Sequence, residues 1–366
     1  MSGQRRATMS HVAREAGVSV MTVSYAFNRP ERVAEATRQR VREAAERLGY
    51  PGPDPSARSL RRGRTATLGV VLGEHLTYAF DDPQATQFLA GVAAVCVEHG
   101  LGLTLIPITG GAEDADRVRE AAVDAVVLWT TVDDDPVLDV VVQRGLPAVV
   151  HGGPARRGIE LVGIDDRAAA RSVGAAAFTA AHAPAVLSFP FDRARRPAVR
   201  RGPAPDAAAF GVTRHRLQGY ADAAVERDLD WTSLPVVVLA RNDRAEAEAA
   251  ALRLLQDGTG VDAIAAMSDE LALGVLAAAK RLGIEVPVQL AVTGWDDSGT
   301  AASARLTTVA QSLREQGELC ARAVIEPDSA ARPTPTWHLV VRESTRTPTL
   351  HVMGDPPVTP STSEVM

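Results

Sequence analysis

After Thr65 the sequence repeats one pattern, in which a short apolar run is followed by a segment with helical periodicity. Continuous apolar runs of this length are typical of strands that are buried on both faces. The predicted strands are residues 67–72, 103–107, 125–129, 148–150, 161–164, 185–188, 236–239, 263–267, 290–293 and 337–341. Helical segments between them, such as 84–99 and 271–282, form βαβ crossovers. The pattern therefore predicts an α/β fold with two doubly wound parallel sheets, whose ligands bind at the carboxyl ends of the strands.

The first 64 residues differ from the rest of the chain in charge. They contain 13 Arg and 6 Asp or Glu, a net charge of +7, whereas the whole chain has a net charge of −6. A basic segment joined to an acidic body indicates a nucleic-acid-binding module attached to a second function. The 366 residues are also too many for one ordinary core.

The basic segment has the periodicity of three short helices, at residues 11–16, 20–28 and 36–48. Thr8 and Ser19 are placed to cap the first two, because a hydroxyl oxygen accepts a backbone N–H of the first turn. The spacing predicts a helix-turn-helix, whose second helix enters the major groove of DNA. A small three-helix bundle without a role in DNA binding is the alternative.

Three runs of this segment carry a resemblance to a known family: VAREAGVSVMTVSYAFN, TRQRVREAAERLGY and ARSLRRGRT. They resemble the headpiece and hinge of the lactose-repressor (LacI/GalR) family. The resemblance implies a hinge helix at about residues 54–62 that forms when two subunits lie side by side on operator DNA. It also implies that Leu60 wedges into the minor groove, with Ala57 beside it and Arg58 close to the DNA backbone. In the free protein, a flexible Arg-rich linker is the alternative for the same residues.

The resemblance also assigns positions in the headpiece. It implies base-reading roles for Val20, Met21 and Tyr25. It implies phosphate contacts for Thr8, Ser19, Thr22, Ser24, Asn28, Thr37 and Tyr50. Tyr25 stands where the family usually has an arginine that grips a guanine, so bidentate readout is lost there. Asp54 stands where the hinge usually begins with asparagine, and one extra residue, Gly52, precedes it. These departures change the expected operator sequence but not the mode of binding.

The resemblance continues through the body, most clearly between residues 263 and 311. Its signature is Ser268-Asp269 ahead of a helix, Gly-Trp-Asp-Asp after a strand, and Leu-Thr-Thr-Val-x-x-Gln. This implies a two-lobed, periplasmic-binding-protein-like core whose chain crosses between lobes near Gly163, Gln311 and Arg332. The expected domains are a headpiece at 1–64, a core at 65–352 and a disordered tail at 353–366. Lobe one is expected at about 65–163 and 312–332, and lobe two at about 164–311 and 333–352.

Candidate ligand-binding residues are Tyr78, Phe80, Asp81, Arg216, Ser268 and Asp296. Arg216 opens Arg-x-x-Gly-Tyr, where the resemblance implies an arginine that reaches hydroxyls or an acidic group; a helix-surface arginine is the alternative. Asp296 directly follows a strand and is placed to accept hydrogen bonds from vicinal hydroxyls; a turn-forming aspartate is the alternative. We expect Asp269 to be a helix N-cap and the neighbouring Ser268 to face the ligand.

Two further segments carry expectations. Tyr78, Phe80 and Asp81 combine aromatic faces with a carboxylate, which suits a sugar ring, although simple packing explains them equally well. Residues 192–215 are rich in Pro, Arg and Ala, and we expect an exposed loop there; a second DNA contact is the alternative.

The pattern offers no catalytic constellation, so we expect no enzyme, no cofactor and no metal site. The pairs Asp165-Asp166 and Asp296-Asp297 are adjacent, and adjacent side chains of an extended chain point to opposite sides. The two cysteines have no metal-type spacing, no apolar stretch spans a bilayer and the N-terminus lacks a signal sequence, which favours a cytoplasmic protein.

The expected function is a DNA-binding transcriptional regulator, a repressor in most family members, that binds double-stranded operator DNA as a homodimer. We expect the helix at 84–99 and its neighbouring surface to hold the dimer together. The expected effector is a small molecule, a sugar or sugar phosphate, bound between the lobes. The alternatives are a cytosolic sugar sensor without specific DNA readout and a regulator that responds to a protein co-regulator.

Overall fold

The structure is a computed structural model that describes residues 7–52, 64–73, 76–256, 258, 260–327 and 333–346. The chain divides into two compact units, residues 1–67 with 122–124, and the rest of the chain. The expected hinge with Ala57, Arg58 and Leu60, and the expected tail at 353–366, lie outside the described residues.

In the part of the first unit that the structure describes, four short helices surround one small core. They are α1 (Met9–Ala16), α2 (Val20–Asn28), the 3-10 helix η1 (Pro30–Arg32) and α3 (Glu35–Arg47). The core consists of Val12, Ala13, Ala16, Val23, Ala26, Val41, Ala44 and Ala45. Gly17 ends α1 with a left-handed backbone (φ 63°), a conformation that glycine adopts without steric cost. The predicted three-helix arrangement is confirmed, with bounds that shift by two residues at most.

The second unit begins with a five-stranded sheet in the order β2-β1-β3-β4-β5, in which β1, β3, β4 and β5 pair in parallel. Its strands are β1 (Thr67–Leu72), β2 (Gly102–Pro107), β3 (Ala125–Trp129), β4 (Ala148–His151) and β5 (Glu160–Val162). Its helices are α5 (Tyr78–Asp81), α6 (Pro83–Glu98), α7 (Asp114–Glu120), α8 (Pro136–Arg144) and the distant α14 (Leu313–Ile325). We call this sheet with its helices the first lobe.

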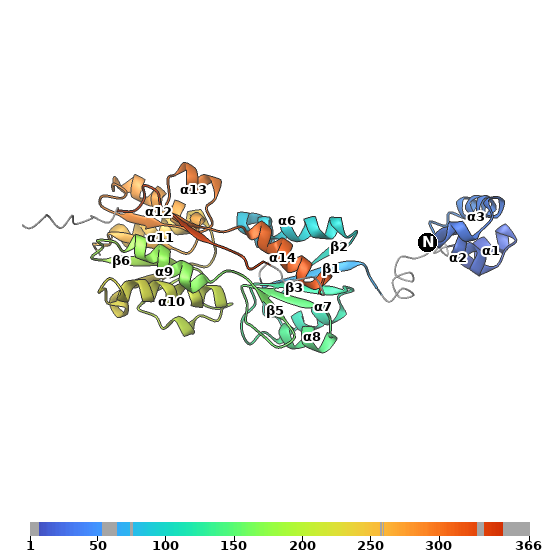
Figure 1. The fold of residues 1–366 in the computed structure, drawn as a ribbon, viewed down its shortest axis with the longest axis horizontal. Coiled ribbons are helices and arrows are strands. Elements are labelled where there is room, and N and C mark those ends of the chain that lie inside the picture. The colour runs from blue at the N-terminus through green and yellow to red at the C-terminus, as the bar shows by residue number, and fades with distance from the viewer. Residues whose placement is uncertain are drawn as a thin grey trace, which may run out of the picture. The chain divides into compact units, whose positions relative to one another are not determined.

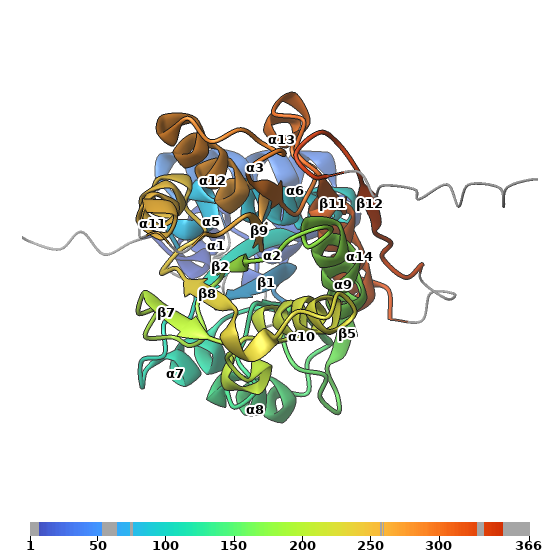
Figure 2. The same ribbon diagram turned by 90° about the vertical axis from the view of Figure 1, so that its left-hand side faces the viewer.

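A second sheet follows in the order β10-β9-β6-β8-β7. Its strands are β6 (Pro184–Ser188), β7 (Ala198–Arg201), β8 (Pro235–Val238), β9 (Ala263–Ala266) and β10 (Ala291–Thr293). Its helices are α9 (Asp166–Ala177), α10 (Gly211–Val225), α11 (Arg244–Gln256), α12 (Asp269–Leu282) and α13 (Gly299–Ser303). In Figure 1, α11 and α12 lie on one side of β6 and α10 on the other, and Figure 2 shows α10 beside α9. We call this sheet with its helices the second lobe.

Two predictions about strands were incomplete. Residues 192–215 are not only a loop, because they contain β7, which pairs antiparallel with β8, and the short 3-10 helix η2 (Pro205–Ala207). The predicted strand at 337–341 does not join either of the two five-stranded sheets. It forms β12 (His338–Val340), which pairs antiparallel with β11 (Thr308–Ala310) in a separate two-stranded ladder.

The helix α14 returns to the first lobe by packing closely against α6. A Cβ atom at Gly91 of α6 would lie 2.0 Å from the carbonyl oxygen of Arg314, and one at Gly317 would lie 2.2 Å from that of Phe88. Only glycine fits at these two crossing points, so the pair of glycines sets the distance between the helices.

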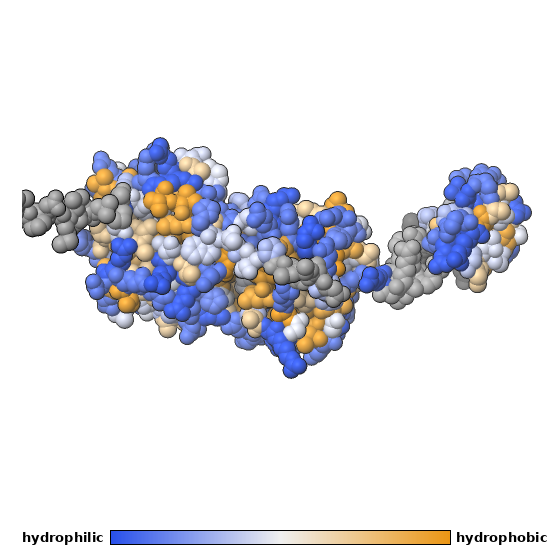
Figure 3. Space-filling view, in the orientation of Figure 1, coloured by the Kyte–Doolittle hydropathy of each residue, from blue (hydrophilic) through white to orange (hydrophobic). Residues whose placement is uncertain are grey.

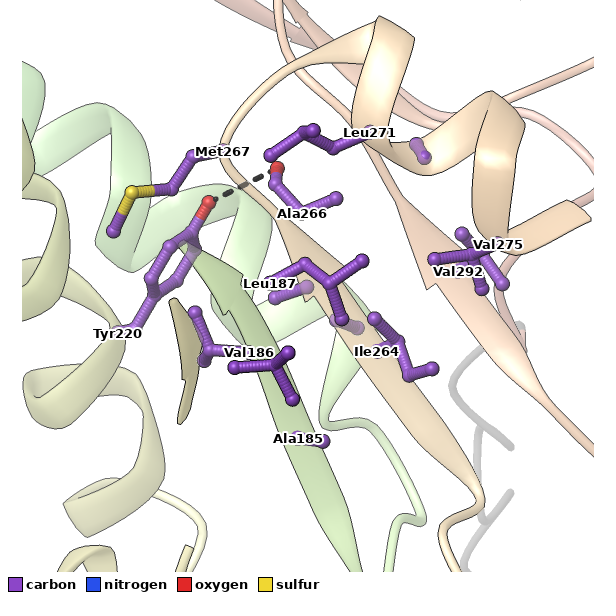
Figure 4. Packing of buried hydrophobic residues seen from close by; sticks show 14 of the residues in the cluster. Ala185, Val186, Leu187, Tyr220, Ile264, Ala266, Met267, Leu271, Val275 and Val292 are labelled. Carbon is purple, nitrogen blue, oxygen red and sulfur yellow. Dashed lines mark hydrogen bonds between the residues drawn. The ribbon is translucent and has the colours of Figure 1, made fainter. Parts of the chain in front are cut away.

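Each lobe has its own apolar core. In the second lobe, strand residues Val186, Leu187 and Ile264 belong to one buried cluster with Tyr220 of α10, whose hydroxyl donates to the carbonyl oxygen of Ala266 at 3.3 Å (Figure 4). On the face shown in Figure 3, hydrophilic and apolar patches alternate over the surface. Within the described ranges, no helix is both long and apolar enough to cross a bilayer.

Candidate functional site

The helix α2 exposes apolar side chains at its start. Val20 is 46% exposed and Met21 63% exposed, whereas Val23 and Ala26 are buried in the core. Because successive residues of a helix are turned by about 100°, Met21 and Tyr25 lie on the side opposite the buried pair, and Val20 lies at the edge between the two sides. The predicted base-reading residues therefore lie on or beside the outward face of the second helix.

Four of the predicted phosphate-contacting residues, Thr8, Ser19, Thr22 and Thr37, lie at helix starts, whereas Ser24 and Asn28 lie further along α2 and Tyr50 follows α3. Ser19 caps α2, since its Oγ accepts a hydrogen bond from the backbone N–H of Thr22 at 3.0 Å. Thr8 precedes α1, and Asn28 donates from Nδ2 to the carbonyl oxygen of Ser24 at 2.9 Å. The remaining two are Thr37, in the first turn of α3, and Tyr50, just after it.

The second unit contains a cleft of about 570 Å³ between its two lobes. Its lining residues follow the carboxyl ends of strands in both sheets, as a doubly wound fold predicts. From the first lobe come Asp82, Trp129, Thr130, His151 and Gly152, and from the second Asp166, Phe189, Asn242, Arg216 and Asp296. Gln311 and Gln316 also line it. The volume suits a small organic ligand.

Arg216 projects from α10 into the cleft and is buried. Its Nε donates to Oδ1 of Asp166 at 2.8 Å and its Nη1 donates to the carbonyl oxygen of Met267 at 2.5 Å. Its guanidinium carbon lies 3.8 Å from the ring centre of Trp295. The Arg216 guanidinium is thus paired with a carboxylate, hydrogen-bonded to a carbonyl oxygen and stacked on an aromatic ring. Among the described residues, no side chain or carbonyl group accepts a hydrogen bond from its third nitrogen, Nη2.

Asp296 also lines the cleft, three residues after the end of β10. Its backbone has a φ of 112°, which is strained for a residue other than glycine. Its backbone N–H donates to the carbonyl oxygen of Val309 at 2.7 Å, which helps to hold this conformation. Burial raises the pKa of its carboxyl group well above the usual value, and the Asp269 carboxylate raises it further, whereas Arg216 lowers it.

The roles of Ser268 and Asp269 differ from those predicted. Ser268, not Asp269, is the N-cap of α12, with its Oγ accepting from the backbone N–H of Leu271 at 3.1 Å. The same hydroxyl donates to Asn242, and Ser268 is not among the residues that line the cleft. Asp269 accepts hydrogen bonds from the backbone N–H of Ser298 and from the Thr308 hydroxyl, both at 2.7 Å. Asp269 therefore holds the loop that carries Asp296.

The residues predicted on the loop after β1 lie in the short helix α5. Phe80 is 64% exposed and Asp81 is exposed, and neither lines the cleft. The side chain of Tyr78 lies outside the described residues. The next residue, Asp82, is buried and does line the cleft, and its carboxylate caps α6 by accepting from Gln84 N–H at 2.8 Å.

Sequence reasoning missed several cleft residues besides Asp82, namely His151, Asp166, Asn242, Gln311 and Gln316. His151 ends β4 and Asp166 begins α9 after β5. Their position at a strand's carboxyl end was the available signal. Gln316 carries no such signal, because it lies within α14 and reaches the cleft only through the packing of that helix.

Two ion pairs join the lobes beside the cleft. Arg193 pairs with the buried Asp135, and Arg214 Nη2 lies 2.9 Å from Oδ2 of Asp133. Burial raises the pKa of Asp135, although the backbone N–H of Val137 and the charge of Arg193 oppose this. Residues predicted as a solvated loop therefore contact the first lobe. Among the described residues, no group of three or more His, Cys, Asp or Glu side chains could hold a metal ion.

Two family models match parts of this chain. Residues 8–52 match the family described as "Bacterial regulatory proteins, lacI family", and residues 194–345 match "Periplasmic binding protein-like domain". The chain is 39% identical to the HTH-type transcriptional regulator Rv3575c of Mycobacterium tuberculosis over 335 residues, which cover 90% of this chain and 93% of the relative.

Two solved structures are also similar. A LacI-family transcriptional regulator from Corynebacterium glutamicum has 29% identity and a TM-score of 0.70, and the likeness covers 94% of this chain and all of that one. A complex of the transcriptional regulator CelR with cellobiose has 26% identity and a TM-score of 0.64, covering 93% of this chain and all of that one. These relatives are named as regulators and not as enzymes. The chain therefore belongs to the lacI family of bacterial regulatory proteins and is a helix-turn-helix DNA-binding transcriptional regulator.

Proposed function

We propose that this regulator is a homodimeric repressor of the bacterial cytoplasm, where chromosomal DNA is found, and that a sugar or sugar phosphate in the cleft sets its affinity for operator DNA. The observation that carries the effector class is the buried Arg216, paired with Asp166 and placed beside Asp296 in the cleft. A guanidinium fork and carboxylates together hydrogen-bond to several hydroxyls of one small molecule.

Aromatic side chains support the same ligand class. Trp129 and Phe189 line the cleft, one from each lobe. An aromatic face packs against the C–H face of a sugar ring, while the polar groups take its hydroxyls. The similar regulator CelR was solved with cellobiose, which is a ligand of this class.

The helix α6 is our candidate for the dimer interface. Its residue Val97 is 81% exposed, which is unusual for a large apolar side chain. A two-fold axis through this surface brings two copies of the same patch together. Two headpieces then read half-sites about one helical turn apart on a near-palindromic operator.

A ligand in the cleft can change the arrangement of the two lobes, because residues of both lobes line the cleft. A ligand shifts an equilibrium only if it binds one arrangement of the lobes better than the other. Coupling of about 1–3 kcal/mol, which changes DNA affinity about 5- to 150-fold, is typical of such switches. We propose that the hinge at about residues 54–62, with its Leu60 wedge, responds to the arrangement of the lobes and so changes the affinity for DNA.

The test is selection of genomic fragments by the purified full-length chain, followed by titration of the best fragment with D-glucose, D-ribose, cellobiose and glucose 6-phosphate. We expect enrichment of a palindrome and a change in its affinity with one of these compounds. Failure to enrich any sequence at low salt would contradict the operator-binding role. Leu60→Ala is the matched variant: it should weaken operator binding and leave sugar affinity intact, and unchanged operator binding would exclude Leu60 as the wedge.

A further inference from the structure

A chain of four side chains connects the two lobes at the floor of the cleft. His151 ends β4 of the first lobe, and its Nε2 lies 2.9 Å from Oε1 of Gln316 in α14. Gln316 Nε2 donates to Oε1 of Gln311 at 3.0 Å. Gln311, between β11 and α14, donates from Nε2 to Oδ1 of Asp296 at 2.8 Å in the second lobe.

In this series of hydrogen bonds each side chain donates to the next, in the order His151, Gln316, Gln311 and Asp296. Oδ1 of Asp296 accepts from Gln311, so Gln311 turns its NH₂ group to Asp296 and its carbonyl oxygen to Gln316. Gln316 uses its own NH₂ group on Gln311 and is left with a carbonyl oxygen for His151. A carbonyl oxygen only accepts, so the imidazole hydrogen of His151 must be on Nε2. The other ring nitrogen, Nδ1, then carries a lone pair.

The surroundings of His151 keep this lone pair buried. The side chain lines the cleft, yet the residue is only 8% exposed, and Nδ1 has no hydrogen-bond partner among the described residues. The ring of Phe88 packs behind it, with ring centres 5.0 Å apart. Burial lowers the pKa of His151, although the hydrogen bond with Gln316 opposes this, so the ring is neutral at pH 7. A buried acceptor without a partner is costly, and buried polar atoms in proteins are nearly always satisfied.

We propose that Nδ1 of His151 accepts a hydrogen bond from a hydroxyl group of the effector, and that Gln316, Gln311 and Asp296 hold His151 in the tautomer that makes this possible. The proposal rests on the proposed effector role of the cleft and narrows its chemistry. The effector must present a donor at this point, so a phosphate oxygen or a carbonyl oxygen is excluded from contact with His151. Gln311 and Gln316 are positioning residues, because they act on the effector through the imidazole.

The first test needs no effector. Full-length protein labelled with ¹⁵N-histidine is examined at pH 7.5 by two-bond ¹H–¹⁵N correlation, which identifies the protonated nitrogen of each imidazole. We expect the hydrogen of His151 on Nε2; a hydrogen on Nδ1 would overturn the proposal. Gln316→Glu keeps an acceptor for Nε2 and should preserve this tautomer, whereas Gln316→Met removes it and should give a mixture. An unchanged spectrum in Gln316→Met would also contradict the proposal.

The second test separates the two ring nitrogens by substitution. In His151→Asn the side-chain amide occupies the place of Nδ1, and in His151→Gln it occupies the place of Nε2. Calorimetric titration with each compound of the panel that binds the wild-type protein should show at least a tenfold loss of affinity for His151→Gln and a smaller loss for His151→Asn. Equal losses, or wild-type affinity in His151→Gln, would refute the contact. If no compound of the panel binds the wild-type protein, the proposed effector class fails, while the tautomer measurement still decides about the chain of hydrogen bonds.

Discussion

Asn242 donates a hydrogen bond from Nδ2 to Oδ2 of Asp82 at 3.0 Å, and this bond joins the second lobe to the first across the cleft. Oδ1 of the same aspartate caps α6 by accepting from the backbone N–H of Gln84. One carboxylate thus serves both the fold of the first lobe and the contact between the lobes. The two roles are separable by mutation.

We expect Asp82→Ala to destabilise the protein more than Asp82→Asn. Both changes remove the carboxylate oxygen that accepts from Asn242, but asparagine keeps a side-chain oxygen that can accept from Gln84 N–H, so only Asp82→Ala removes the helix cap, and loss of a cap costs about 0.5–2 kcal/mol. Urea unfolding of both variants measures the difference. Equal losses of unfolding free energy would show that the cap contributes nothing here.

We expect that lysine cannot replace Arg216 in the response to the effector. Lysine keeps the positive charge but cannot hold Asp166 and the Met267 carbonyl oxygen with a planar fork while stacking on Trp295. We expect Arg216→Lys and Arg216→Ala to abolish the response of operator binding to the effector while the variants still bind DNA. The control is Arg171→Ala, an exposed arginine on α9 that pairs with Glu226. Operator anisotropy with and without effector is the measurement, and a normal response in Arg216→Lys would exclude the fork.

In the headpiece, two substitutions should affect operator binding in different ways. Tyr25 lies on the outward face of α2, so Tyr25→Ala should alter the preferred base at one operator position, at a cost of about 1–3 kcal/mol. Thr37 is at the start of α3 and is proposed to contact phosphate, so Thr37→Ala should weaken binding equally for all sequences. Binding to a library of operator variants distinguishes them. A uniform loss in Tyr25→Ala would remove it from base readout.

Asp269 should make the protein less stable as the pH rises from about 4 to 6. Burial is the main cause that raises its pKa to about 6, whereas the hydrogen bonds from Ser298 and Thr308 lower it. The folded state therefore holds a proton that the unfolded state has released, and the free energy of unfolding falls by about 1.4 kcal/mol per pH unit from this group. Asp296 and Asp135 act in the same direction, so the test compares the wild-type protein with Asp269→Asn. The free energy of unfolding should fall less steeply with pH in the variant, and equal slopes would contradict the raised pKa of Asp269.

The fold could largely be predicted from the sequence, because its signals are local. Buried parallel strands such as β3 and β6 are continuous apolar runs, and α2 begins at a serine that caps it. The edge strand β7 has no such signal. Its residues are mostly exposed and include two arginines, since only one of its edges is paired and its faces meet solvent.

The cleft was harder to predict, because its residues come together only through tertiary packing. His151 and Gln316 are 165 positions apart in the chain and form one hydrogen bond. Asp81 and Asp82 show that a difference of one position decides whether a side chain lines the cleft. Both are aspartates at the same turn, but α6 begins directly after Asp82, and its first turn directs that carboxylate inward.

We propose that occupancy of the cleft changes the affinity of the protein for operator DNA. The most direct measurement is the dissociation constant of the full-length protein for its selected operator, by fluorescence anisotropy, with and without a saturating compound that calorimetry shows to bind. We expect the dissociation constant to change about 5- to 150-fold, and this change should be lost in Arg216→Ala and retained in Arg171→Ala. A compound that binds in the cleft and leaves the operator dissociation constant unchanged would contradict this proposal.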